Sequence, residues 1–192
     1  MSPNDYPYLC GIDFQLSVPA VPWDEPSFCV QEITGTLKAM TSDMEEVQAG
    51  TIKLLLINAA QATNERTHLL DVCDAHSGFL ESLYWALFDE EGEIKQELDI
   101  EPCWDDLLVL WEFDVPDQFR KSGIIVQAFE TAIAAFASMD LTVAAMESKS
   151  HHFTGLDLTV EEWRQLGFIR IAGSQFAFRD NYKKNPYRIE QE

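Results

Sequence analysis

The sequence predicts a domain of the α/β (α+β) class, with a mixed β-sheet and helices on both of its faces. Apolar periodicity gives the order strand, strand, helix, strand, helix, strand, helix, strand, strand. The segment Leu107–Val115 is apolar except for two acids, and Gly123–Ser138 repeats apolar residues at helical spacing. With 192 residues, 46% of them hydrophobic, the chain can bury a sizeable core.

The N-terminal residues 1–27 carry five of the eight prolines and predict an extended arm, with an edge strand over Phe14–Val18. Residues 28–192 are then expected to form the single domain. The N-terminus has neither the basic start nor the apolar stretch of a signal peptide. A cytoplasmic location is therefore the expectation.

The first half of the domain begins with two strands, over residues 28–40 and 47–60, that can pair as a hairpin. Gly35 lies inside the first strand and is a candidate for a β-bulge. Residues 66–89 then repeat apolar side chains at spacings of three and four, which predicts one long helix with Gly78 as its bending point.

The second half reads as strand, helix, strand, short helix and terminal hairpin. Thr159 and Glu162 fit a capping box at the start of the short helix, and Gly167 is placed to end it. The hairpin turns at Gly173-Ser174. The elements are expected over residues 107–115, 123–138, 141–146, 159–167 and 168–179.

The formal net charge of −20 opposes binding to nucleic acid and to anionic lipid, so neither is expected as a partner. It suits a cationic substrate such as an amine, or a basic partner protein, although solubility alone also explains it. No apolar run is long enough to span a membrane. The four cysteines are widely spaced, which favours reduced thiols and argues against a zinc site.

The most informative segment runs from the apolar strand through a short turn to a helix that begins at Gly123. The first turn of a helix offers unpaired N–H groups and partial positive charge, which suit a pyrophosphate. Arg120, Lys121 and Ser122 precede the helix and can add charge and donors, while Gly123 allows close approach to the backbone. The alternative is an ordinary connection between a strand and a helix.

Two motifs resemble the GNAT superfamily of acyl-CoA-dependent N-acyltransferases. The segment from Arg120 to Ile125, five residues after Val115, is similar to its phosphate loop, and Trp163–Phe168 is similar to its Tyr-x-x-x-Gly-Phe motif. Asp74-Ala75-His76-Ser77, before the central strand, looks like a bacterial and fungal subgroup. The resemblance covers roughly residues 28–180. It implies a GNAT-like sheet splayed at its central strands, Leu107–Val115 and Leu141–Met146.

The same resemblance implies acetyl-CoA as co-substrate, no metal, and acetyl transfer to an amine acceptor, either a small molecule or a protein. The central strand would bind the pantetheine arm and the loop would bind the pyrophosphate. Ile125 replaces a small residue and threatens to crowd that pyrophosphate, and Trp163 replaces a tyrosine that serves as general acid. The implied cofactor-binding residues are Phe113, Asp114, Val115, Arg120, Lys121, Ser122, Gly123, Ile124, Ile125 and Trp163.

A carboxylate is expected to take the proton of the attacking ammonium. Glu112 is the first candidate because it interrupts the apolar strand; Asp74 and Asp106 are weaker candidates, and an edge-exposed or arginine-paired Glu112 is the alternative. His76 lies on an apolar helix stripe, where a hydrogen-bonded core residue competes with a role in the acceptor site.

Two other functions stay open at this point. The altered motif positions favour a catalytically silent GNAT-like domain that binds CoA or a partner protein. The acidic surface also fits an interaction protein that engages a basic partner. The oligomeric state is expected to be a monomer or a homodimer.

Overall fold

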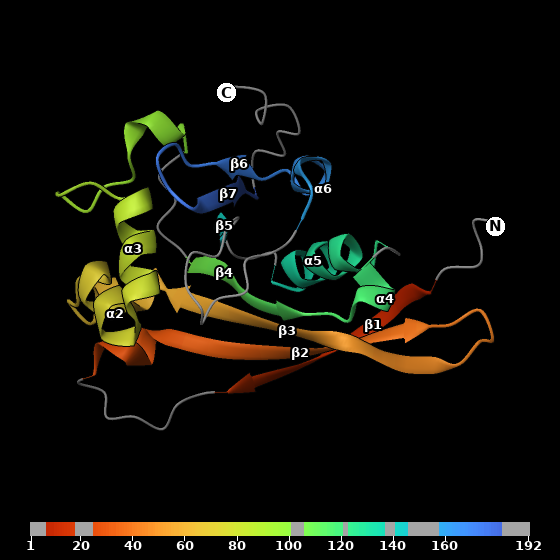
Figure 1. The fold of residues 1–192 in the computed structure, drawn as a ribbon. Coiled ribbons are helices and arrows are strands. Elements are labelled where there is room, and N and C mark those ends of the chain that lie inside the picture. Colours follow the sequence, from red (N-terminus) through yellow and green to blue (C-terminus); the bar gives the residue numbers. More distant parts are fainter. Residues whose placement is uncertain are drawn as a thin grey trace.

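The computed structural model describes residues 7–17, 25–100, 106–120, 123–136, 141–145 and 158–181. Its strands form one seven-stranded sheet in the order β1-β2-β3-β4-β5-β7-β6 (Figure 1). Every neighbouring pair is antiparallel except β4 and β5, which are parallel. The predicted mixed sheet of an α+β fold is therefore confirmed.

Four antiparallel strands make up the first part of the sheet: β1 (Tyr8–Ser17), β2 (Val30–Met40), β3 (Glu46–Asn58) and β4 (Asp106–Asp114). A short 3-10 helix, η1 (Pro26–Cys29), leads into β2. The expected strand near Phe14 is present, but it begins at Tyr8 and pairs with β2 along its whole length. Residues 8–17 of the expected arm thus belong to the sheet.

Gly35 is not a bulge, so that prediction is wrong. It pairs in regular register with Phe14 and Ile52, and the register of β2 and β3 shifts instead between Leu37 and Lys38. A Cβ atom at Gly35 would lie only 2.6 Å from Cγ2 of Ile52. The glycine is needed because its neighbours on both flanking strands pack over its Cα atom.

The single long helix predicted over residues 66–89 is also wrong. Three helices connect β3 to β4: α1 (Ala59–Asn64), α2 (Leu69–His76) and α3 (Gly78–Leu87). The break falls at Ser77, whose backbone is extended and whose hydroxyl accepts a hydrogen bond from the N–H of Leu80. Serine is a strong N-cap, so capping a new helix competes successfully with continuing the old one before Gly78.

The rest of the chain follows the predicted order. A 3-10 helix, η2 (Gln96–Leu98), precedes β4, and one unpredicted helical turn, α4, follows it. The capping box of Thr159 and Glu162 is confirmed, and Gly167 ends that helix with a positive φ of 75°. The elements are α4 (Asp117–Arg120), α5 (Ile124–Ala135), β5 (Leu141–Ala145), α6 (Val160–Gln165), β6 (Ile169–Arg170) and β7 (Phe176–Asp180).

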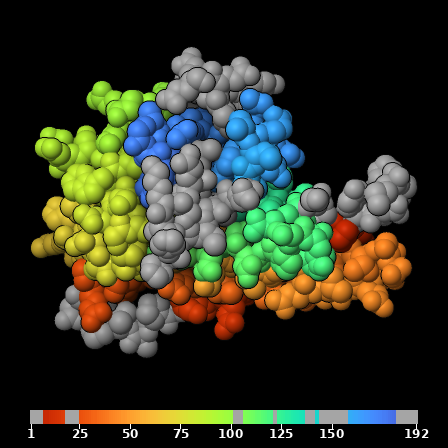
Figure 2. All heavy atoms as spheres, in the orientation of Figure 1, coloured from red at the N-terminus to blue at the C-terminus, as the bar shows by residue number. Residues whose placement is uncertain are grey.

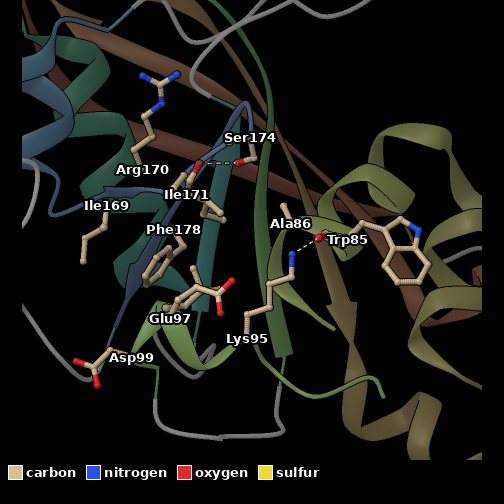
Figure 3. Close-up of a pocket in the computed structure, with 13 residues that line it drawn as sticks. Trp85, Ala86, Lys95, Glu97, Asp99, Ile169, Arg170, Ile171, Ser174 and Phe178 are labelled. Atoms are coloured by element: carbon tan, nitrogen blue, oxygen red, sulfur yellow. Dashed lines mark hydrogen bonds between the residues drawn. The ribbon is translucent and has the colours of Figure 1, made fainter. Parts of the chain in front are cut away.

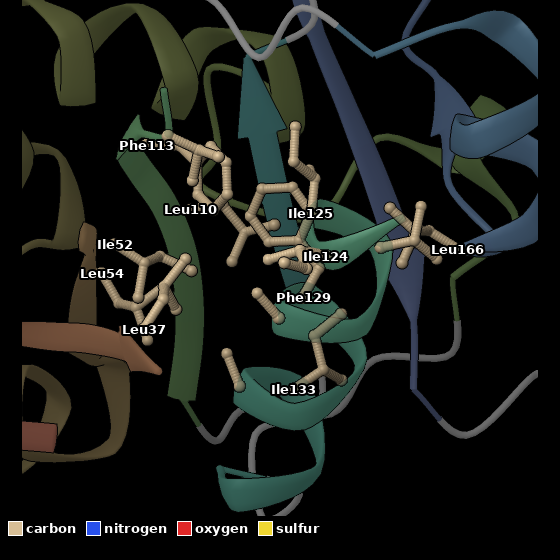
Figure 4. Close-up of a cluster of buried hydrophobic side chains, with 14 of the residues drawn as sticks. Leu37, Ile52, Leu54, Leu110, Phe113, Ile124, Ile125, Phe129, Ile133 and Leu166 are labelled. Atoms are coloured by element: carbon tan, nitrogen blue, oxygen red, sulfur yellow. The ribbon is translucent and has the colours of Figure 1, made fainter. Parts of the chain in front are cut away.

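Helices cover both faces of the sheet, as predicted. Alternate residues of β4 enter two separate cores: Leu108 and Leu110 pack with α5 and α6, whereas Leu107 and Val109 pack with α1, α2 and α3. Figure 4 shows Phe129 of α5 among the side chains of the first core. The β2–β3 hairpin extends past these helices, so its tip is exposed (Figure 2).

Three cysteines have free thiols, in agreement with the expectation of reduced cysteines: Cys10 is exposed, whereas Cys29 and Cys73 are buried. Cys103 lies outside the described residues. Burial raises the pKa of the Cys73 thiol to about 12. A thiol with so high a pKa carries almost no thiolate at neutral pH, and only the thiolate is an efficient nucleophile.

In a Cys103→Ser variant, we expect Ellman's reagent to modify one thiol rapidly in the native protein and two more only after unfolding. The fast thiol should be Cys10, because Cys29 and Cys73 are shielded by the core. A further Cys10→Ser substitution should remove the fast phase. Two or more fast thiols in the native Cys103→Ser protein would contradict this assignment.

Candidate functional site

The candidate site begins where β4 leaves β5. The two strands pair from Leu107↔Leu141 to Leu110↔Ala144, and β4 then continues to Asp114. On its other side, β4 pairs with β3 through a register shift that leaves Trp111 as an extra residue. A bulge of this kind bends a strand and redirects its backbone groups. The last four residues of β4 therefore lie beyond the pairing with β5 that the described residues show.

The chain after β4 folds back on itself before α5 begins. Nε of Arg120 donates to the carbonyl oxygen of Val115 at 2.9 Å and lies 3.5 Å from a carboxylate oxygen of Asp117. Lys121 and Ser122 lie outside the described residues. Gly123 has φ 73°, and a Cβ atom built on it would meet no atom within 4 Å. The space in front of this glycine is open to an approaching group.

Several residues expected to contact a cofactor place their side chains in the core beside this loop. Phe113, Val115 and Ile124 are buried, and Ile125 is 5% exposed with its side chain in the same cluster (Figure 4). The expectation that Ile125 crowds the loop is therefore corrected: its side chain packs into the core.

Trp163 lies in the core and is only 2% exposed. Its ring packs edge-on against Phe168, with 5.2 Å between the ring centroids. The sequence assigned this position to the wall of a cofactor site. The structure gives its side chain a packing role between α6 and the sheet.

The three candidate carboxylates are not brought together. Glu112 lies opposite Lys53 in the β3–β4 register, and its Oε2 accepts a hydrogen bond of 2.5 Å from the Lys53 ammonium. Asp74 is exposed on α2, and Asp106 is the first residue of β4, at the far end from the bulge. Glu112 is therefore paired, as the alternative expected, but with a lysine rather than an arginine.

A chain of aromatic rings lies on the α2–α3 face beside the bulge. The Trp111 ring packs edge-on against His76, with 5.6 Å between centroids, and against Phe79 at 4.9 Å. Phe79 also contacts Phe176 of β7 at 5.2 Å, and Phe176 is paired with Ala145 of β5. The rings therefore lie between the bulge of β4 and the β5–β7 pair.

His76 carries polar contacts on both ring nitrogens. Nε2 lies 4.0 Å from Oε1 of Glu32, and Nδ1 lies 3.3 Å from the hydroxyl of Ser77. Burial lowers the pKa of His76 below 6.5, and the Glu32 carboxylate opposes that shift only in part. The imidazole is thus neutral at pH 7. The sequence singled out the Asp74–Ser77 motif, but gave no sign that its histidine meets the bulge.

A hollow of about 780 Å³ lies between the end of α3, η2 and the β6–β7 hairpin (Figure 3). Lys95 donates from Nζ to the carbonyl oxygen of Trp85 at 2.7 Å, and Ser174 donates to that of Ile171 at 3.0 Å. The sequence did not predict this hollow because its walls come from segments far apart in the chain, around residues 85–99 and 169–178. It adjoins the Leu87 end of α3, whereas His76 adjoins the Gly78 end.

The described residues contain no helix long and apolar enough to cross a membrane. Within those same ranges, no three side chains of His, Cys, Asp or Glu are grouped as they would be around a metal ion. No family model, curated protein or solved structure matches this chain.

Proposed function

We propose that this chain is an N-acetyltransferase that binds acetyl-CoA where β4 separates from β5. The observation that carries the proposal is one juxtaposition: β4 bulges at Trp111 just after its pairing with β5 ends, and the loop after β4 leads to the open start of α5 at Gly123. The first feature offers backbone groups to an extended pantetheine arm, and the second offers N–H groups to a pyrophosphate. The sequence resemblance to the GNAT superfamily points to the same pair of subsites.

In this mechanism, a backbone N–H of the terminal part of β4 polarises the thioester carbonyl. The amine forms the new C–N bond as the C–S bond breaks, and the electron pair leaves on the CoA sulfur. A proton lost from the nitrogen then neutralises the thiolate. Trp163 is buried and its indole is not an acid, so it has no part in that step.

The direct test is titration calorimetry of the full chain with acetyl-CoA, followed by an assay of thiol release. Spermidine, tyramine and a lysine-bearing peptide serve as probe amines, because the net charge of −20 favours cationic acceptors. Saturable binding with amine-dependent release of CoA supports the proposal. Absence of acetyl-CoA binding contradicts it.

Replacing Gly123 with valine should weaken acetyl-CoA binding by more than about 1 kcal/mol, roughly fivefold or more. Valine opposes the φ of 73° and places a side chain in the open space before α5. Calorimetry on the folded variant measures the effect.

Gly173→Val is the matched control for this substitution. Gly173 has a similar φ of 71° and equally open surroundings, but it lies in the β6–β7 turn. The control should show the same kind of backbone strain with native affinity for acetyl-CoA. Equal affinities of the Gly123→Val and native proteins would remove the loop from the site.

A catalytically silent CoA-binding module is the second candidate. Two observations favour it. Glu112, the first candidate for the general base, is paired with Lys53, and Trp163, which stands in place of the general acid, is buried. Saturable acetyl-CoA binding without thiol release for any of the probe amines would select this candidate over the transferase.

A further inference from the structure

His76 lies beside the bulge of β4 and has three neighbours there. Its ring packs against Trp111, the bulged residue; Nδ1 faces the Ser77 hydroxyl; and Nε2 faces Glu32 of β2. The side chain is mostly buried, with 18% of its surface exposed. A polar ring so placed, beside the one irregular point of the central strand, is more than packing requires.

The surroundings of the neutral ring admit the tautomer that carries its proton on Nδ1. The Ser77 oxygen already accepts a hydrogen bond from the N–H of Leu80, and its second lone pair can accept the Nδ1 proton of His76 at 3.3 Å. The lone pair of Nε2 is then free to accept a proton on the side of Glu32. A protonated ring would gain the Glu32 carboxylate as its counter-ion.

We propose that His76, rather than Glu112, accepts the proton of the attacking ammonium; this rests on the proposed acetyltransferase function. Nε2 takes one proton from R–NH3⁺, and the freed amine attacks the thioester carbon. The C–S bond breaks, the second nitrogen proton neutralises the CoA thiolate, and His76 returns its proton to solvent. The net products are the amide, CoA thiol and one proton.

Charged groups on the elements around His76 include Glu32 on β2, Lys53 on β3, Glu112 on β4, Glu81 on α3, and Asp71 and Asp74 on its own helix. Register places Lys53 opposite Glu112, and these two bind each other. Asp74 is exposed. Glu32 is therefore the carboxylate that acts on His76, and it opposes the lowering of the His76 pKa by burial.

The test compares native protein with His76→Gln in acetyl-CoA turnover of spermidine from pH 5 to pH 10. We expect His76→Gln to lower turnover at pH 7 by about a hundredfold. The defect should shrink as the pH rises, because free amine then forms without a base. A structural role would lower the rate by a constant factor. His68→Gln, an exposed histidine eight residues away, should behave as the native protein.

Glu32→Gln is a second, independent variant. Since the carboxylate raises the pKa of His76, its loss should move the acid limb of the pH–rate profile to lower pH. The pH–rate profile of Glu32→Gln tests the role of His76 even if the His76→Gln variant does not fold.

Native turnover and a native pH–rate profile in His76→Gln would overturn the assignment of His76 as the base. A pH-dependent loss of turnover seen in Glu112→Gln but not in His76→Gln would also overturn it. In both cases the active native protein would leave the transferase proposal standing. A native protein that neither binds acetyl-CoA nor releases thiol overturns the transferase and the role of His76 together.

Discussion

Replacing Gly50 with alanine is expected to lower the free energy of unfolding by about 3 kcal/mol or more. Gly50 has φ 151°, in a region that other residues rarely adopt. A Cβ atom there would collide with the carbonyl oxygen of Asp114 and would lie 2.7 Å from Cγ2 of Val115. Both clashes involve the end of β4, so relief requires the strand itself to move.

Chemical denaturation followed by circular dichroism measures this loss. Gly78→Ala is the matched control, because a Cβ atom at Gly78 meets nothing within 4 Å and the residue begins α3. Alanine there should be neutral or stabilising by up to about 1 kcal/mol. If Gly50→Ala keeps native stability, the close approach of β3 to Val115 is not a feature of the folded protein. If the Gly50→Ala variant keeps native stability but binds acetyl-CoA weakly, the backbone strain at Gly50 has been transferred to the loop after β4.

Replacing Trp163 with alanine is expected to cost about 3–5 kcal/mol, because it removes the largest side chain of the core and leaves a cavity. Its ring packs on Phe168, which joins α6 to the terminal hairpin. The loss of this contact should loosen α6 from the sheet. The midpoint of urea denaturation, with its slope checked for two-state behaviour, measures the change.

Trp85→Ala makes the matched comparison, since Trp85 is 42% exposed on α3. Its loss should cost much less than that of Trp163, because more of its surface is already in water. Equal losses in the two variants would argue against a core position for Trp163. Trp163→Tyr should fall between native protein and Trp163→Ala, because a smaller ring leaves a smaller void.

Apolar patterning was enough to predict the order of strands and helices, because each buried face leaves a local period in the sequence. The prediction of one long helix over residues 66–89 was wrong, because apolar spacing does not reveal a capping interaction that starts a new helix. Apolar spacing continues across Ser77, but the capping hydrogen bond from the Leu80 N–H divides the segment into α2 and α3. Similarly, Gly35 marks a close approach of side chains from other strands, which no local pattern reports.

Only the parts of the candidate site that lie in one continuous stretch of the chain could be predicted from the sequence. The glycine at the start of α5 and the loop before it could be located from sequence, since that turn depends on local residue types. The Lys53–Glu112 pair and the contact of His76 with Trp111 depend on strand register and on how α2 crosses the sheet. Those are long-range outcomes of packing, so the sequence could name Glu112 as the first candidate base and His76 as an acceptor-site candidate, but could not show which partners each of them has.

The parallel contact between β4 and β5 divides the described sheet into two antiparallel blocks of strands. Strands β1–β4 form one antiparallel block, β5, β7 and β6 form another, and only the four residue pairs from Leu107 to Leu110 hydrogen-bond them together in the described sheet. Blocks that share so short a seam can open separately, so their amide protons should exchange with solvent at different rates. Any molecule that bonds to both strands past Leu110 would extend the seam and couple the two rates.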